Sequence, residues 1–122
     1  MLGWQFFIQI RGDEARNPKD GKGSLLATWE AGLGGTDWIE QLVVQGKAKD
    51  LGGNGYPNRY TVTAMTLKNA LAGGLPRHGG PPTIGENYFL PTGWTGSARL
   101  DLARLNELDP TCLLEVEAWD QS

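Results

Sequence analysis

The clearest pattern in this chain is the alternation of hydrophobic and polar residues near its two ends. Between residues 4 and 11 the apolar positions are Trp4, Phe6, Ile8 and Ile10. Between residues 112 and 119 they are Cys112, Leu114, Val116 and Ala118. Successive side chains of a β-strand point to opposite faces, so both segments are predicted to be strands with one buried face. Such strict alternation argues against a parallel sheet that is buried on both faces.

The best-marked helix is predicted from Asp37 to Gly46. Its apolar residues recur on one face at helical spacing, namely Ile39, Leu42 and Val43. Asp37 is predicted to cap the first turn, and Glu40, three residues later, completes a capping-box pattern. Gly46 suits the C-terminal end, because glycine readily adopts the left-handed conformation that is common there.

Six further segments complete the predicted secondary structure. Strands are expected at residues 24–30, 59–63, 87–90 and 97–100, and helices at residues 64–72 and 102–108. The segment at 24–30 also fits a short helix, but the glycines that closely follow it favour a strand. Gly and Pro are dense in the loop at 50–58. The longer loop at 73–96 holds seven glycines and four prolines.

This order of elements predicts an α+β fold, with a mixed α/β arrangement as the alternative. We expect a single mixed or mainly antiparallel sheet with two or three short helices on one face. With 122 residues, the chain is predicted to form one compact domain, 1–122, with a long Gly/Pro-rich loop at 73–96. A domain of this length buries about two-thirds of its unfolded surface, so it can fold without disulfides or metal.

The charge of the chain indicates which kinds of partner it can bind, and its cysteine content indicates the cellular compartment. The formal net charge is −3 and the Lys and Arg residues are scattered, which disfavours a nucleic-acid partner. The single cysteine, Cys112, cannot form an internal disulfide, which is typical of a reducing compartment. No apolar run is long enough for a membrane span, and the first residues lack the basic region of a signal peptide. We therefore expect a soluble cytoplasmic protein.

The common motifs of catalysis and cofactor binding do not fit. One cysteine and one histidine are too few for a structural zinc site. The segment Gly-Lys-Gly-Ser at 21–24 lacks the earlier glycine and the Ser or Thr directly after lysine that a phosphate-binding loop needs. No Gly-x-Ser-x-Gly elbow occurs. The sequence therefore predicts no metal, no cofactor and no catalytic residue, and it favours a protein that is not an enzyme.

The candidate site follows from a predicted reversal of the chain at residue 63. If the helix at 64–72 runs back along the strand at 59–63, the two Gly/Pro-rich loops meet at one edge of the fold. The predicted ligand- or partner-binding residues on these loops are Asn54, Tyr56, Asn58, Arg59, Arg77, His78 and Trp94. Asn, Tyr and Arg are typical of polar recognition surfaces. Trp119, which shares the side of Glu115 and Glu117, is a second candidate anchor.

Three functional hypotheses use this site. The first is a small non-catalytic binding module that occupies a surface of a protein partner, as a regulator or inhibitor does. The second is a binder of a small anionic ligand, with the loops at 50–59 and 73–86 as its pocket. The third is a small enzyme that uses His78. The missing catalytic and cofactor motifs favour the first hypothesis.

Overall fold

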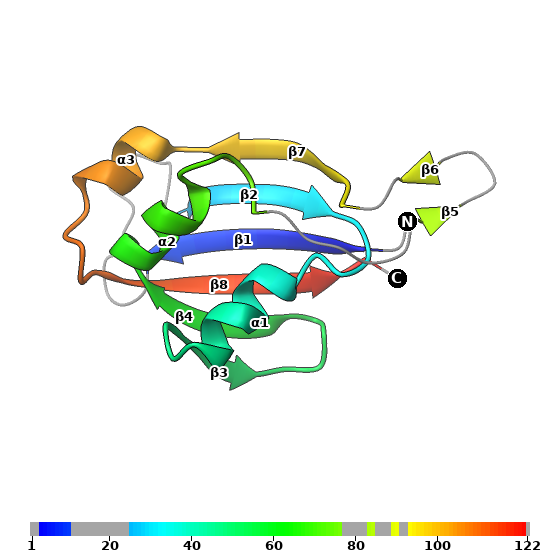
Figure 1. Ribbon diagram of the computed structural model, residues 1–122, viewed down its shortest axis with the longest axis horizontal. Coiled ribbons are helices and arrows are strands. Elements are labelled where there is room, and N and C mark those ends of the chain that lie inside the picture. The colour runs from blue at the N-terminus through cyan, green and yellow to red at the C-terminus, as the bar shows by residue number, and fades with distance from the viewer. Residues whose placement is uncertain (1–2, 11–24, 77–82, 85–88, 91–92, 122) are drawn as a thin grey trace.

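The computed structural model describes residues 3–10, 25–76, 83–84, 89–90 and 93–121. In chain order these residues form β1 (Trp4–Ile10), β2 (Leu25–Ala31), α1 (Asp37–Val44), β3 (Ala48–Gly52), β4 (Asn58–Thr63), α2 (Ala64–Leu71), β5 (Thr83–Ile84), β6 (Phe89–Leu90), β7 (Thr95–Leu100), α3 (Leu102–Glu107) and β8 (Leu113–Asp120). Figure 1 shows how they are arranged.

Six of the strands form one sheet in the order β3-β4-β8-β1-β2-β7. Every neighbouring pair in this sheet is antiparallel. The two alternating segments at the ends of the chain, β1 and β8, lie side by side in its centre. The short strands β5 and β6 form a separate antiparallel pair. The prediction of an α+β fold with one mainly antiparallel sheet and two or three short helices is confirmed, and the described residues form three.

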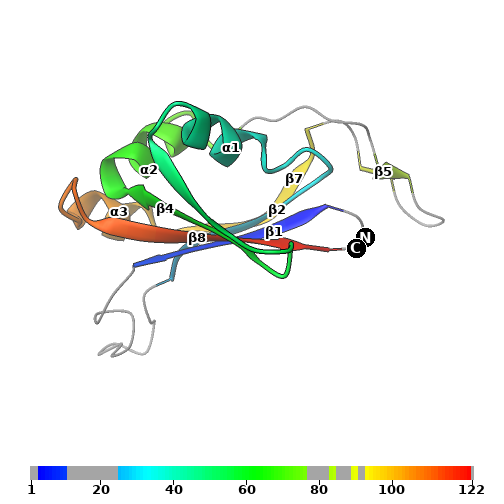
Figure 2. The same cartoon turned by 90° about the horizontal axis from the view of Figure 1, so that it is seen from below.

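The hydrophobic core lies between the sheet and the helices. Helices α1 and α2 cover one face of the sheet, and α3 packs beside α2 at its end (Figure 2). The inward side chains of the central strands, such as Phe6, Ile8 and Val116, are fully buried. Three rings meet under α1: the centroid of Phe6 lies 5.1 Å from that of Trp29 and 5.7 Å from that of Trp38. The two tryptophan rings are 5.6 Å apart.

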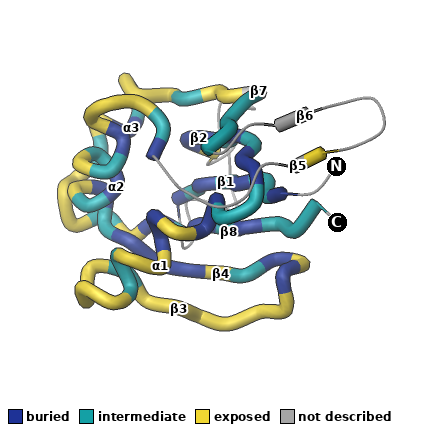
Figure 3. The backbone as a smooth tube through the Cα atoms, turned by 45° about the vertical axis from the view of Figure 1, so that its right-hand side comes forward, coloured by how far each residue is buried: buried dark blue, intermediate teal, exposed yellow. Residues whose placement is uncertain are grey.

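The strand predicted at residues 24–30 is confirmed as β2, but β3 was missed. The loop predicted at residues 50–58 is wrong at its start, because Ala48–Gly52 pairs with β4. β3 is an edge strand, and most of its residues are exposed (Figure 3). Edge strands carry charged residues and have no buried face to impose alternation, so the pattern of Lys49, Asp50 and Leu51 did not indicate a strand.

The predicted cap of α1 by Asp37 is wrong. The N-cap is Thr36, Asp37 is the first helical residue, and no side chain caps the helix. The Thr36 hydroxyl instead lies 3.3 Å from the Glu40 carboxylate. The predicted end is confirmed: Gly46 has a φ of +76°, and its N–H donates to the carbonyl of Val43. Thr36 is the residue directly before Asp37, and both residue types can cap a helix. The sequence alone therefore did not decide which of the two is the N-cap.

Helix α2 is held at its start by its own cap and by the chain that precedes β8. The Thr63 hydroxyl accepts a hydrogen bond from the N–H of Thr66 at 3.2 Å. The N–H groups of Ala64 and Met65 donate to the carbonyls of Cys112 and Pro110. The first orphan donors of the helix are therefore satisfied by a distant segment, which fixes α2 against the sheet.

Candidate binding surface

One face of the six-stranded sheet has no described element packed on it (Figure 2). We call this the open face. The strand register places on it side chains from β1, β2, β4, β7 and β8, because paired residues of antiparallel strands point to the same face. Its residues are Gln5, Phe7, Gln9, Thr28, Glu30, Arg59, Thr61, Arg99, Glu115, Glu117 and Trp119. Most of them are half-buried.

Polar contacts order the open face across neighbouring strands. The Gln5 amide donates to the Thr28 hydroxyl at 2.7 Å, and this hydroxyl donates to the carbonyl of Phe6 at 2.7 Å. The Gln9 amide donates to Glu115 at 3.3 Å. Cross-strand contacts of this kind restrict rotamers, so much of the surface is arranged before any partner arrives.

Arg59 and Glu117 form an ion pair on this face. The Arg59 Nε lies 3.5 Å from the Glu117 Oε2. The two residues are cross-strand partners on β4 and β8. The Arg59 side chain is 48% exposed, whereas that of Glu117 is 18% exposed. An exposed pair of this type contributes little to stability, so its arginine remains available for an external acceptor.

The turn between β3 and β4, residues 53–57, is closed by side chains of its own loop. The Asn58 amide oxygen accepts a hydrogen bond from the N–H of Gly55 at 2.9 Å. The Asn54 amide oxygen accepts one from the N–H of Tyr56 at 3.2 Å. The turn is also tied to β8, because the N–H of Asp120 donates to the carbonyl of Gly55 at 2.7 Å. This ordered turn displays Tyr56, which is 55% exposed.

The structure brings four of the seven predicted site residues together. Asn54, Tyr56, Asn58 and Arg59 lie within or directly after the turn at 53–57, next to the open face. Asn54 and Asn58 hold the turn through the bonds above, so their role in the fold is to position Tyr56. We call Tyr56 and Arg59 the hairpin pair.

Trp94 lies elsewhere. It precedes β7, and the sheet order puts β7 and the β3–β4 hairpin at opposite edges. Its ring covers Gly96, where an added Cβ would meet a ring carbon at 2.6 Å, and its carbonyl accepts a hydrogen bond from the N–H of Gly32 at 2.9 Å. Trp94 is half-buried, because glycine at 96 leaves room for its ring to lie on the backbone.

Arg77 and His78 lie outside the described residues. The described start of their loop, residues 73–76, follows α2 and lies above the middle of the sheet, well away from the turn at 53–57 (Figures 1 and 3). Whether Arg77 and His78 reach the hairpin pair stays a prediction. The hypotheses of an anionic-ligand pocket and of an enzyme, which depend on these two residues, stay predictions as well.

The structure places Phe7 and Trp119 on the open face, although Phe7 was left out of the predicted site and Trp119 was predicted only as a second anchor apart from it. The register sets Glu117 opposite Phe7, and Trp119 opposite Gln5. Both aromatic residues occupy polar positions of otherwise alternating strands; this signal indicated Trp119 in the sequence and could have found Phe7 as well. A large apolar side chain on the solvent side of a strand points to a partner more often than an exposed leucine elsewhere does.

Tyr60 lies directly behind this surface, on the helix-covered side of β4, and is 3% exposed. Burial raises the pKa of the Tyr60 phenol to about 12, and the charges of Asp50 and Glu40 act in the same direction. A hydrogen bond with the Asn58 side chain partly opposes this rise. Tyr60 therefore stays neutral at all ordinary pH values.

This pKa gives an expected pH dependence of stability. The unfolded phenol ionises near its ordinary value of 10.0 and the folded one near 12, so the contribution of Tyr60 is fully present below pH 10. It is lost as the pH rises to 12, by about 2–3 kcal/mol. Urea unfolding between pH 8 and 12 should show this loss in the wild type and a smaller one in Tyr60→Phe. Parallel curves would show that the phenol is solvated.

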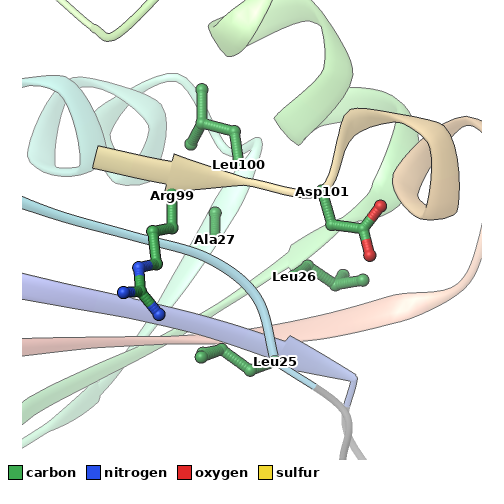
Figure 4. A pocket seen from close by; sticks show the side chains of 6 residues that line it. All are labelled: Leu25, Leu26, Ala27, Arg99, Leu100 and Asp101. Carbon is green, nitrogen blue, oxygen red and sulfur yellow. The ribbon is translucent and has the colours of Figure 1, made fainter. Parts of the chain in front are cut away.

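Four pockets lined by described residues have volumes between about 210 and 410 Å³, and none of these four includes a residue of the turn at 53–57. One lies between β2 and β7 (Figure 4). There Leu100 and Arg99 leave β7 in opposite directions, and Arg99 pairs with Thr28 on the open face. Arg99 is thus a basic residue at the edge of the open face remote from Arg59.

Among the described residues, no three His, Cys, Asp or Glu side chains gather so that they could hold a metal ion. None of the helices in that part of the chain has the length and apolar character required to span a bilayer. No family model, curated protein or solved structure matches this chain.

Proposed function

We propose that this protein is a non-catalytic binding module that occupies a flat surface of a folded protein partner through its open face and the hairpin pair. The observation that carries the proposal is the open face itself. A six-stranded sheet is covered by helices on one side, and on the other side no described element covers Phe7 and Trp119.

The dimensions of the open face suit a protein better than a small molecule. Five strand spacings of about 4.8 Å and a strand length of about 20 Å give roughly 500 Å². With the hairpin turn added, this approaches the area of about 800 Å² that one partner contributes to a standard interface. A small ligand binds in a concave pocket, and of the open-face residues only Thr61 and Arg99 line any of the four pockets described above.

The residue types of the surface are also those that carry binding energy. Tyr, Trp and Arg are enriched among the residues whose truncation weakens protein complexes most. Tyr56 and Arg59 stand on an ordered turn, which lowers the entropy lost on binding. Glu30, Glu115 and Glu117 lie between Arg59 on one side of the sheet and Arg99 on the other. We therefore expect a partner surface with a basic centre and acidic flanks.

The test begins with capture of partners by the tagged full chain, followed by titration calorimetry with the purified partner. Tyr56→Ala and Arg59→Ala should each weaken the complex by about tenfold or more. Val44→Ala is the matched control, because Val44 is 82% exposed on α1 and lies on the opposite face of the molecule. It should leave the affinity unchanged.

Thermal unfolding of the same variants separates binding from folding. Both hairpin variants should unfold within a few degrees of the wild type, since neither removes a buried group. The proposal is wrong if the partner binds both hairpin variants as tightly as it binds the wild type. It is also wrong if the captured species is a small molecule whose affinity depends on neither residue.

A further inference from the structure

The turn between β3 and β4 contains the one Asn-Gly dipeptide of the chain, Asn54-Gly55. An asparagine before a glycine is prone to deamidation, in which the backbone nitrogen of the next residue attacks the carbonyl carbon of the side-chain amide. Glycine carries no side chain that would shield this nitrogen, so the pair reacts more readily than an asparagine before a larger residue. Asn54 is exposed, so water reaches its amide.

The turn itself requires both residues of this pair. Gly55 has a φ of +92°, which other residues rarely adopt, and an added Cβ would lie 3.3 Å from the Cβ of Asp120. The Asn54 amide oxygen accepts the hydrogen bond from the N–H of Tyr56, a local bond that asparagine is suited to make two residues along the chain. The fold therefore keeps a reactive dipeptide in the turn that displays Tyr56.

Three hydrogen bonds oppose the reaction in the folded turn. The Gly55 N–H must lose its proton before the nitrogen can attack, and it donates to the Asn58 amide oxygen at 2.9 Å. The Gly55 carbonyl accepts from the N–H of Asp120 at 2.7 Å, which fixes the same residue from its other side. The Asn54 amide is held by Tyr56 at 3.2 Å. Ring closure requires rotation of these groups, so the turn must first open locally.

We propose that Asn54-Gly55 is a modification site at which opening of the turn leads to deamidation of Asn54. The Gly55 nitrogen loses its proton and forms a bond to the side-chain carbonyl carbon of Asn54. The bond from this carbon to the amide nitrogen breaks, and ammonia leaves. Water then opens the resulting five-membered succinimide at either of its two carbonyls. One product is aspartate, and the other is isoaspartate, in which the main chain runs through the side-chain carbonyl.

The two products differ in their effect on the turn. Aspartate at position 54 keeps an oxygen that can accept from the N–H of Tyr56. Isoaspartate lengthens the main chain by a carbon atom in a turn without spare room, since even a Cβ on Gly53 would lie 2.3 Å from the carbonyl oxygen of Pro57. The isoaspartate form therefore cannot reclose the turn. In a consequence that rests on the proposed function, it also withdraws Tyr56 from the binding surface.

Mass spectrometry measures the reaction in the full chain. Trypsin releases residues 50–59 as one peptide, because they follow Lys49 and end at Arg59, and the exchange of amide for acid raises the mass of this peptide. A synthetic peptide of the same ten residues is the reference without a fold. In mildly alkaline buffer the folded chain should convert Asn54 at least about tenfold more slowly than the peptide. In urea the two rates should agree.

Variants of Asn58 test the bond that restrains the attacking nitrogen. Asn58→Ala removes the acceptor of the Gly55 N–H and should raise the rate about fivefold, the factor that corresponds to one hydrogen bond. Asn58→Asp keeps an acceptor and should stay near the wild-type rate. Asn106→Ala, an exposed position on α3, is the matched control and should change nothing. Circular dichroism checks that each variant is folded, and the comparison of wild type with peptide decides the matter without any variant.

Two results overturn the proposal: conversion in the folded wild type as fast as in the peptide, or a folded Asn58→Ala that converts no faster than the wild type. After chromatographic separation, the isoaspartate form should unfold at a lower urea concentration than the aspartate form, and equal midpoints contradict the effect on the turn. None of these measurements uses a partner, so they stand apart from the proposed function. With the captured partner, the isoaspartate form should bind about tenfold more weakly than the aspartate form.

Discussion

Replacing Trp29 by alanine is expected to lower the free energy of unfolding by about 3–5 kcal/mol. Trp29 is 1% exposed, and its ring contacts those of Phe6 and Trp38 under α1. Among the residues that the structure describes, Trp29 is the largest fully buried side chain, and its removal leaves a cavity that two rigid rings cannot fill. The free energy of unfolding of a native protein is only about 5–15 kcal/mol, so we expect the variant to fold with little stability left.

Urea unfolding followed by far-UV circular dichroism measures this loss. Trp119→Ala is the matched control, because it removes the same side chain from the half-buried open face. We expect a clearly smaller loss there, since the Trp119 ring keeps part of its contact with water in the folded state. Equal losses for the two tryptophans would contradict the assignment of the core to the helix-covered side.

Replacing Gly53 by alanine is expected to destabilise the β3–β4 hairpin, with a loss of about 2–4 kcal/mol in unfolding free energy. Gly53 has a φ of +134°, a conformation that other residues rarely adopt. An added Cβ would also lie 2.3 Å from the carbonyl oxygen of Pro57 and 2.8 Å from the Cα of Asn58. Backbone atoms of a tight turn cannot move away cheaply, so strain and overlap act together.

Gly52→Ala is the control, because the neighbouring glycine has a φ of +91° and no atom within 4 Å of an added Cβ. We expect a loss of about 1 kcal/mol there, from backbone strain alone. The same pair tests the function: Gly53→Ala should weaken partner binding through Tyr56 more than Gly52→Ala does. Equal effects of the two substitutions on stability would contradict the close approach of Gly53 to Pro57.

A partner on the open face leaves the aromatic cluster of Phe6, Trp29 and Trp38 untouched, because these rings pack on the helix-covered side of the sheet. The open face can therefore be altered without loss of the core.

Part of the candidate site could be read from the sequence because it is local. Asn54, Tyr56, Asn58 and Arg59 lie within six residues of one another, and the bonds that close their turn span two or three residues. The position of Trp94 could not be predicted from local sequence. Its ring rests on Gly96, but its place at the far edge depends on the pairing of β7 with β2.

By itself the sequence determined which side chains of β1 and β8 face the core, because alternation along a strand is a local property with a period of two. It also determined where α1 ends, because Gly46 readily adopts the left-handed backbone conformation that follows the last turn of a helix. Only the tertiary structure decided the sheet order and the edge strand β3. It also decided that Phe7, Arg59 and Trp119 share the open face. These features arise from pairing between strands distant in the chain, where the hydrogen bonds are made by backbone groups that every residue carries.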